Sequence, residues 1–288
     1  MVHSLSELNK RYLVLSRVKH ILLKVFSFLF ALNFPNKWSV TLSSKLFGLT
    51  AEIADGKKRF VFTTTNPILL WRVKTFYSKE PETIEWIKSF KSDDIFFDIG
   101  ANIGLYTTYA GDRCKKVYAF EPEASNFGLL NKNIQINGLG RKVKAYCIAI
   151  SDENTFNTIR LSSLTPGSAL HSFAVNKDSN GKEFNPVFEQ GCISYTLDSI
   201  VYDIGFEVPN HIKVDVDGLE SKILNGSMRL LKEKRLKSIL VELNMKLLQD
   251  LEIIKLLKEC GFDVYKTSEY HMEEKGKGSV VNMIFERS

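Results

Sequence analysis

A loop that starts with an acid and is rich in glycine follows a strand expected over residues 94–98. It reads Asp98-Ile-Gly-Ala-Asn-Ile-Gly104. Glycine lets the backbone turn sharply and approach a ligand closely, and the helix expected to begin at Gly104 offers N–H groups to an anion such as a carboxylate. The alternative is a plain turn from strand to helix. The predicted cofactor-binding residues of this loop are Asp98, which can accept hydrogen bonds from a cationic amino group, Gly100, Asn102 and Gly104.

A second acid, Glu121, follows the next expected strand and stands 21 residues beyond Gly100. A carboxylate at this place in an α/β domain can bind the hydroxyls of a ribose. Alone, Glu121 could equally be a solvated charge at a strand end. Loop and carboxylate together predict a nucleoside site.

The glycine spacing indicates which nucleoside is bound. A dinucleotide fingerprint that starts at Gly100 requires glycine at positions 102 and 105, where this sequence has Asn102 and Leu105. A pyrophosphate would also meet the Asp98 carboxylate at the mouth of the loop. A cofactor that ends in an amino acid zwitterion tolerates that acid, so the pattern favours S-adenosylmethionine. An NAD(P)-dependent oxidoreductase is the alternative.

A third group of charged residues follows the strand expected over 212–216. Lys213, Asp215, Asp217 and Glu220 lie within eight positions. Acids stabilise a helix N-terminus, which explains Glu220 but explains Asp215 less well, because Asp215 is expected at the strand end facing the crevice. We predict that Asp215 is the general base or orients the acceptor, and that Lys213 and Asp217 position it or the substrate.

Two alternatives concern the same chemistry. Asp215 could join Glu242 and Asn244 in holding a cation such as Mg²⁺, although the prediction is a site without metal. His171, in the irregular segment 152–196, is an alternative base. His211 begins a strand at the end remote from the expected site, and we interpret it as structural.

Short apolar strands alternate with amphipathic helices after residue 91. This alternation predicts an α/β fold: a doubly wound, mostly parallel sheet with helices on both faces. The last two strands have no helix between them, so the final one is expected to be antiparallel. Ligands of such sheets bind beyond the carboxyl ends of the strands, where strand order reverses. The expected strands cover residues 94–98, 117–120, 143–150, 212–216, 239–243, 262–265 and 280–285.

The first 34 residues differ from the rest. They carry a net charge of +4 out of the total of +6, together with an apolar run from Ile21 to Leu32. That run is shorter than the ~20 residues of a membrane-spanning helix. It predicts a basic helix that either lies in a membrane surface or packs on the domain. The predicted domains are this helix (1–34), a strand and helix extension (35–90) that includes helices on both sides of Pro81, and a cofactor-binding domain (91–288).

The four cysteines, Cys114, Cys147, Cys192 and Cys260, are widely spaced and form no Cys-x-x-Cys pair. This argues against a disulfide framework or a zinc site and favours a reducing, cytoplasmic compartment, with peripheral membrane contact as an option. The main domain has little excess positive charge, so no nucleic-acid partner is expected.

Several of these motifs together resemble one family, the FkbM-type methyltransferases. The resemblance covers roughly residues 80–265 and rests on an ordered set of motifs rather than on any one of them. One departure is Asp217, where the family usually has Glu. The motifs are Asp98–Gly104, Phe120-Glu-Pro122, the helix that reaches Asn133, Ala149-Ile-Ser-Asp152, Thr196-Leu-Asp198 and Ile212–Glu220.

The resemblance implies a class I, Rossmann-like methyltransferase fold and O-methylation by S-adenosylmethionine. The implied acceptor is a hydroxyl, often of a sugar in a glycan, glycolipid or natural product. It also implies that Ser151 and Asp152 lie near the adenine. A nucleoside-binding module at a membrane surface, without catalysis, is the competing interpretation, and the oligomeric state is left open.

Overall fold

The structure is a computed structural model that describes residues 49–168, 172–173, 186–216, 218–268 and 280–288. The chain divides into two units after Leu49, and the fold below is that of Thr50–Ser288. The predicted N-terminal helix and its membrane contact lie outside the described residues. The domain boundaries expected after residues 34 and 90 stay predictions. In the part of the chain that is described, no helix is long and apolar enough to cross a membrane.

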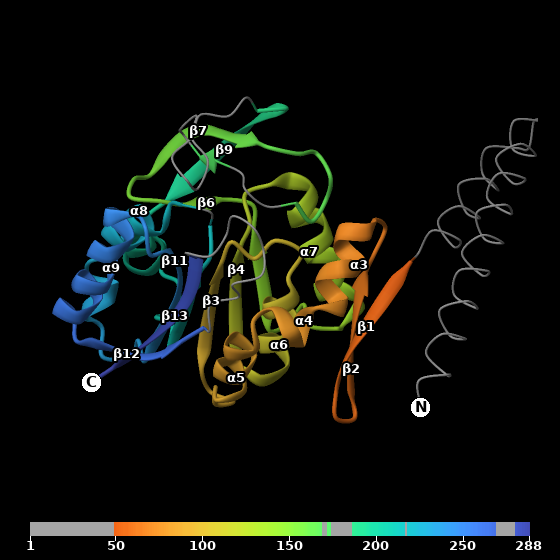
Figure 1. Cartoon of the computed structure of the whole chain (residues 1–288), viewed down its shortest axis with the longest axis horizontal. Coiled ribbons are helices and arrows are strands. Elements are labelled where there is room, and N and C mark those ends of the chain that lie inside the picture. The colour runs from red at the N-terminus through yellow and green to blue at the C-terminus, as the bar shows by residue number, and fades with distance from the viewer. Residues whose placement is uncertain (1–48, 169–171, 174–185, 217, 269–279) are drawn as a thin grey trace, which may run out of the picture. The chain divides into compact units, whose positions relative to one another are not determined.

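A seven-stranded sheet forms the centre of this unit, in the order β12-β13-β11-β10-β3-β4-β5 (Figure 1). Strand β13 runs antiparallel to both of its neighbours, and the other adjacent pairs are parallel. This confirms the predicted α/β fold, mostly parallel with an antiparallel last strand. The strands are β3 (Ile95–Ile99), β4 (Lys116–Phe120), β5 (Val143–Tyr146), β10 (His211–Val214), β11 (Ser238–Asn244), β12 (Phe262–Thr267) and β13 (Val280–Arg287).

Helices cover both faces of this sheet, as Figure 1 shows. One face is covered by α8 (Glu220–Asn225) and α9 (Leu248–Glu259), with a π-helical turn over Ser199–Asp203 and a 3₁₀ turn over Leu230–Lys232. The other face is covered by α3 (Pro67–Lys74), α4 (Phe76–Lys79), α5 (Pro81–Lys88), α6 (Leu105–Arg113) and α7 (Ala124–Ile136).

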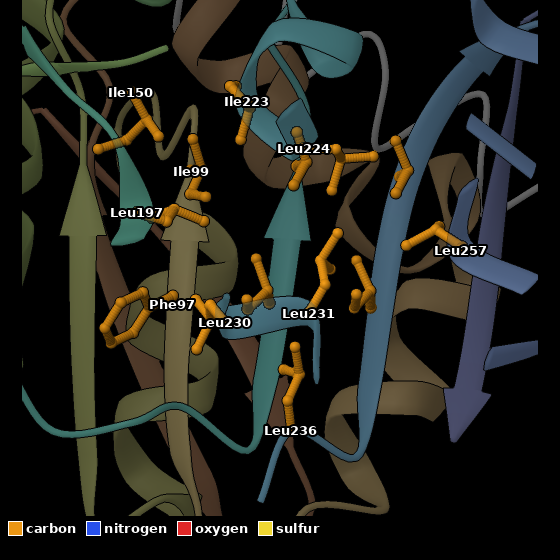
Figure 2. Packing of buried hydrophobic residues seen from close by; sticks show 14 of the residues in the cluster. Phe97, Ile99, Ile150, Leu197, Ile223, Leu224, Leu230, Leu231, Leu236 and Leu257 are labelled. Carbon is orange, nitrogen blue, oxygen red and sulfur yellow. The ribbon is translucent and has the colours of Figure 1, made fainter. Parts of the chain in front are cut away.

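Side chains alternate between these two faces along each strand, as the pleat requires. Phe97, Ile99 and Val214 point to the face covered by α8 and α9, where Figure 2 shows Phe97 beside Leu230 and Ile99 beside Leu197. The residues between them point to the α3–α7 face. That second set includes polar side chains at the carboxyl ends of β3 and β10, although this face also has an apolar core of its own.

The helices before β3 begin at residues that favour a helix N-terminus. Asn66 caps α3 by accepting the Leu69 N–H at 2.9 Å, and Pro67 and Pro81 occupy first-turn positions, where a missing N–H costs nothing. Two helices were expected in this region, and the structure has three over residues 67–88, because the first expected helix is interrupted at Thr75. Its hydroxyl donates to the Trp71 carbonyl at 2.8 Å.

The expected strand over residues 143–150 is wrong in one respect. Strand β5 ends at Tyr146, and Ala149–Ile150 form β6, which pairs with β9 (Phe188–Tyr195) in a separate four-stranded sheet. The other strands of this sheet are β7 (Thr155–Leu161) and β8 (Ser172–Phe173). The strands β1 (Thr50–Asp55) and β2 (Lys58–Thr63) form a two-stranded antiparallel sheet of their own. In α9, Ile253 and Leu257 are buried and Leu251 is exposed.

A buried polar network closes the opposite end of the sheet. The two ring nitrogens of His211 lie 3.0 Å from Asp94 and 2.7 Å from Ser238, and the Trp86 indole N–H donates to the same Ser238 hydroxyl at 2.8 Å. Burial lowers the pKa of His211 despite the neighbouring Asp94. The structure therefore places His211 at the amino end of β10, where it ties α5 to the sheet.

Candidate active site

The predicted site residues gather where the order of the strands reverses. The chain runs from β3 outward to β4 and β5, and then returns to place β10 on the other side of β3. The two strands meet closely, since the Asp215 N–H donates to the Ile99 carbonyl at 3.2 Å. A narrow pocket of about 40 Å³ opens here. It is lined by Arg72, Phe76, Lys79, Glu80, Gly100, Ala101, Asn102, Ile103, Leu105, Tyr106, Lys213 and Asp215.

The glycine loop keeps its shape through left-handed backbone conformations. The φ angles are 80° at Gly100, 50° at Asn102 and 81° at Gly104, and asparagine tolerates this region better than most side chains. A Cβ at Gly100 would lie 1.8 Å from the Asp215 carbonyl oxygen. Gly100 is therefore required for the close approach of β3 to β10, a role that the sequence pattern did not distinguish from ligand approach.

Lys213 and Asp215 form a buried ion pair at the end of β10. The two charged groups are 2.5 Å apart, and the Lys213 side chain is 1% exposed. Burial alone would lower the pKa of Lys213, but Asp215, Glu80 and Asp98 outweigh it and raise that pKa above its ordinary value. Burial opposes ionisation of Asp215 as well, yet Lys213, Lys79 and Arg72 lower its pKa. Both groups are charged at neutral pH.

Asp98 lies beside Lys213 in the parallel register of β3 and β10. One of its carboxylate oxygens accepts a hydrogen bond from the Thr107 hydroxyl at 2.5 Å. The other, Oδ1, is buried and has no hydrogen-bond partner among the described residues. Burial raises the pKa of Asp98 although Lys213 and Thr107 act in the opposite direction. An orphaned acceptor in this position fits a ligand that brings a hydrogen-bond donor.

Glu121 is joined to the loop rather than free in solvent. Its Oε2 accepts from the Asn102 N–H at 2.7 Å, and its Oε1 accepts from the Glu123 N–H at 2.9 Å. Each oxygen retains a second lone pair, which is what two adjacent ribose hydroxyls need. Burial raises the pKa of Glu121 to about 7, against the effect of the backbone hydrogen bonds.

Four lining residues, Arg72, Lys79, Glu80 and Tyr106, were missed by the sequence reasoning. Lys79 pairs with Glu80 at 2.7 Å, and the Lys213 ammonium lies 5.1 Å from the centre of the Tyr106 ring. Burial and Glu80 raise the pKa of Tyr106 well above its ordinary value, so the phenol stays neutral. Lys79 and Glu80 form a charged pair before Pro81 that looks like an ordinary helix end, and Arg72 and Tyr106 carry no local signal.

The pocket lining does not include Asp98, Gly104, Glu121, Ser151 or Asp152. Ser151 is buried and donates to Asp152 at 3.0 Å, and Asp152 lies 3.7 Å from Lys222 of α8. Asp217 and His171 lie outside the described residues. Among the residues that are described, no group of three or more His, Cys, Asp or Glu is arranged to hold a metal ion. The roles of all predicted site residues stay predictions.

Glu220, at the first turn of α8, is a buried acid with an unusual charge state. Its carboxylate accepts from the Gly218 N–H at 3.2 Å and the Val216 N–H at 3.4 Å. Burial nevertheless raises the pKa of Glu220 to about 8. Glu220 therefore accepts hydrogen bonds at the start of α8, as expected, but its ionisation near neutral pH costs free energy because the carboxyl group is buried.

Comparison with known proteins decides the class. The family model described as the methyltransferase FkbM domain matches residues 98–264. The chain belongs to this family. The match confirms the resemblance drawn from the motifs and makes the chain a methyltransferase by family.

The individual proteins that this chain resembles share less than a quarter of its residues over the matched regions. The hexuronic acid methyltransferase AglP of Haloferax volcanii is 24% identical over 217 residues, which are 74% of this chain and 80% of that protein. The solved structure of an FkbM methyltransferase from Methylobacillus flagellatus has a TM-score of 0.42 and 16% identity, and the match covers 67% of this chain but 44% of that one. A precorrin-6y C5,15-methyltransferase from Geobacter metallireducens has a TM-score of 0.43 and 14% identity, with 73% and 87% covered.

Replacing Gly100 by alanine is expected to destabilise the domain by about 3 kcal/mol or more, because the new Cβ meets backbone atoms of Asp215 in a left-handed conformation. Denaturant unfolding measures this change. Gly128→Ala is the control: no atom lies within 4 Å of its Cβ position in α7, so that variant should gain about 0.5–1 kcal/mol. Equal stability of both variants would contradict the close approach.

Glu220→Gln should make stability less dependent on pH. The pKa of Glu220 is raised from 4.5 to about 8 in the folded state, so its contribution is full below pH 4.5 and is lost as the pH rises through 8. Each unit in this range costs about 1.4 kcal/mol. Melting temperatures at pH 5 and pH 8 should therefore differ less in the variant. A difference as large as in the wild type would refute the buried ionisation.

Proposed function

We propose that this methyltransferase uses S-adenosylmethionine to methylate a hydroxyl of a sugar acceptor. The observation that carries the proposal is the pocket in which the Asp215 carboxylate faces the glycine loop. A binding loop for the methyl donor and a group that can receive a proton from a hydroxyl thus share one small volume. Methyl transfer to oxygen requires both.

The donor-binding residues on this proposal are Asp98, the loop from Gly100 to Gly104, and Glu121. The unpartnered Oδ1 of Asp98 is suited to an ammonium group, and the free lone pairs of Glu121 are suited to ribose hydroxyls. Ser151 and Asp152 are assigned to the adenine by family resemblance. When bound, S-adenosylmethionine supplies an electrophilic methyl group on a sulfonium.

Asp215 would orient the acceptor hydroxyl and take its proton. Its lowered pKa makes it a weak base toward a resting alcohol. An attacking hydroxyl becomes strongly acidic as its oxygen forms the new bond, so a weak carboxylate base suffices late in the reaction. Lys213 keeps its proton because its pKa is raised, and its role is to hold Asp215 in place. Asp217 stays a predicted helper of this pair.

The acceptor class is supported by the relative from Haloferax volcanii, whose name specifies a hexuronic acid as its substrate. A sugar in a glycan, glycolipid or natural product remains the proposed acceptor here. The family match and the missing dinucleotide glycines both argue against an NAD(P)-dependent oxidoreductase. Cofactor binding without turnover on any acceptor would favour the non-catalytic binding module.

Glu121→Gln should weaken S-adenosylhomocysteine binding by about tenfold or more, because an amide cannot accept the backbone N–H and the ribose hydroxyls at both positions. In the wild type, affinity should also fall as the pH drops below the Glu121 pKa of about 7, and the variant should lose this dependence. Calorimetry from pH 6 to pH 8 measures both effects. Glu52→Gln, at an exposed site, is the control, and an unchanged affinity in Glu121→Gln would remove Glu121 from the ribose site.

Asp215→Asn should keep S-adenosylhomocysteine affinity but lower kcat by about a hundredfold or more, because an amide cannot take up the proton. The assay follows transfer of a labelled methyl group to glycan and lipid fractions of a cell extract. Asp93→Asn, an exposed residue, is the matched control. Full turnover by the Asp215 variant would exclude its proton-accepting role.

A further inference from the structure

The charges that line the pocket are unequal. Three cationic side chains, Arg72, Lys79 and Lys213, face two acidic ones, Glu80 and Asp215. Lys213 pairs with Asp215 at 2.5 Å, and Lys79 pairs with Glu80 at 2.7 Å. Once these two pairs are formed, the guanidinium of Arg72 is the lining cation without a carboxylate partner among the described residues.

Arg72 is held in place by a backbone carbonyl and not by a carboxylate of the described residues. Its Nε donates to the Gly167 carbonyl at 2.7 Å, which fixes the plane of the guanidinium. A Cβ at Gly167 would lie 2.6 Å from the Leu69 side chain on the same helix, so the two segments are in close contact. The terminal nitrogens of Arg72 have no hydrogen bond to any described residue, and they are the donors that match a carboxylate in a paired arrangement.

We propose that Arg72 binds a carboxylate in this pocket. The inference rests on the proposed function, which offers two sources of that group: the α-carboxylate of the methyl donor's methionine part and the carboxylate of a uronic acid acceptor. In either case the guanidinium orients the molecule that carries the reacting atoms. Arg72 lies before residue 98, outside the region that matches the family.

A bound carboxylate has a consequence for Asp215. Arg72 is one of the cations that lower the pKa of Asp215. An anion paired with the guanidinium offsets this effect, so Asp215 becomes a stronger proton acceptor when the ligand is in place. A carboxylate ligand would thus be aligned and would also improve the base beside it.

The first experiment tests the methyl donor as the source. Calorimetry compares S-adenosylmethionine with decarboxylated S-adenosylmethionine on the wild type, Arg72→Gln, Arg72→Lys and Arg141→Gln. Arg141 is an exposed arginine outside the pocket and serves as the matched control. If the donor carboxylate is the ligand, the wild type prefers the intact donor by about tenfold or more, Arg72→Gln loses this preference, and Arg72→Lys keeps part of it.

The second experiment tests the acceptor as the source. Glucuronate and glucose, which differ in the carboxylate, are compared on protein loaded with S-adenosylhomocysteine by ligand-observed NMR. If the acceptor carboxylate is the ligand, glucuronate binds the wild type and Arg141→Gln about tenfold or more tightly than glucose. Arg72→Gln then binds the two sugars equally. A defect caused only by losing the contact with Gly167 would weaken both sugars alike and would also appear in Arg72→Lys.

The outcomes separate this inference from the proposed function. A wild type that binds intact and decarboxylated donor equally, and glucuronate no better than glucose, overturns the carboxylate site even if Arg72→Gln does not fold. A carboxylate preference that survives in Arg72→Gln also overturns it. Failure of the wild type to bind S-adenosylhomocysteine at all would instead overturn the proposed function.

Discussion

The buried ammonium of Lys213 is the interaction on which this arrangement depends. A lysine in such a place loses its charge unless carboxylates surround it. Asp215 supplies one at 2.5 Å, and Asp98 lies opposite in the neighbouring strand. Because Asp98 lies in β3 and Asp215 follows β10, the need to balance one charge also brings the glycine loop and the end of β10 together.

The pleat of the sheet explains why these groups share one face. Lys213 and Asp215 are two positions apart, as are Ile212 and Val214, so polar and apolar side chains of β10 separate cleanly. One face can then be filled with aliphatic residues without contact with the charges. The face that carries the charges is covered by helices α3–α7, and acidic and basic side chains from this region line a narrow pocket. Electrostatic interactions are strong in such a pocket because it holds little water.

Much of the fold and of the candidate site could be predicted from the sequence. The features that could not be predicted depend on contacts between distant parts of the chain. The strand ends, the left-handed loop and the reversal point depend on local patterns around Asp98, Glu121 and Asp215. Arg72 and Glu80 follow no such pattern, because only the packing of α3 and α4 onto the sheet brings them to the pocket. The division of residues 143–150 between two sheets is similarly decided by pairing with the distant β9.

The pocket is built from two separate parts of the chain. The glycine loop and the end of β10 lie within the region that matches the family. A short stretch before that region supplies four other lining residues, Arg72, Phe76, Lys79 and Glu80. On the proposed function, substitutions in that stretch change the shape and charge that the pocket offers to a ligand, while the glycine loop and the strand-end acids stay the same.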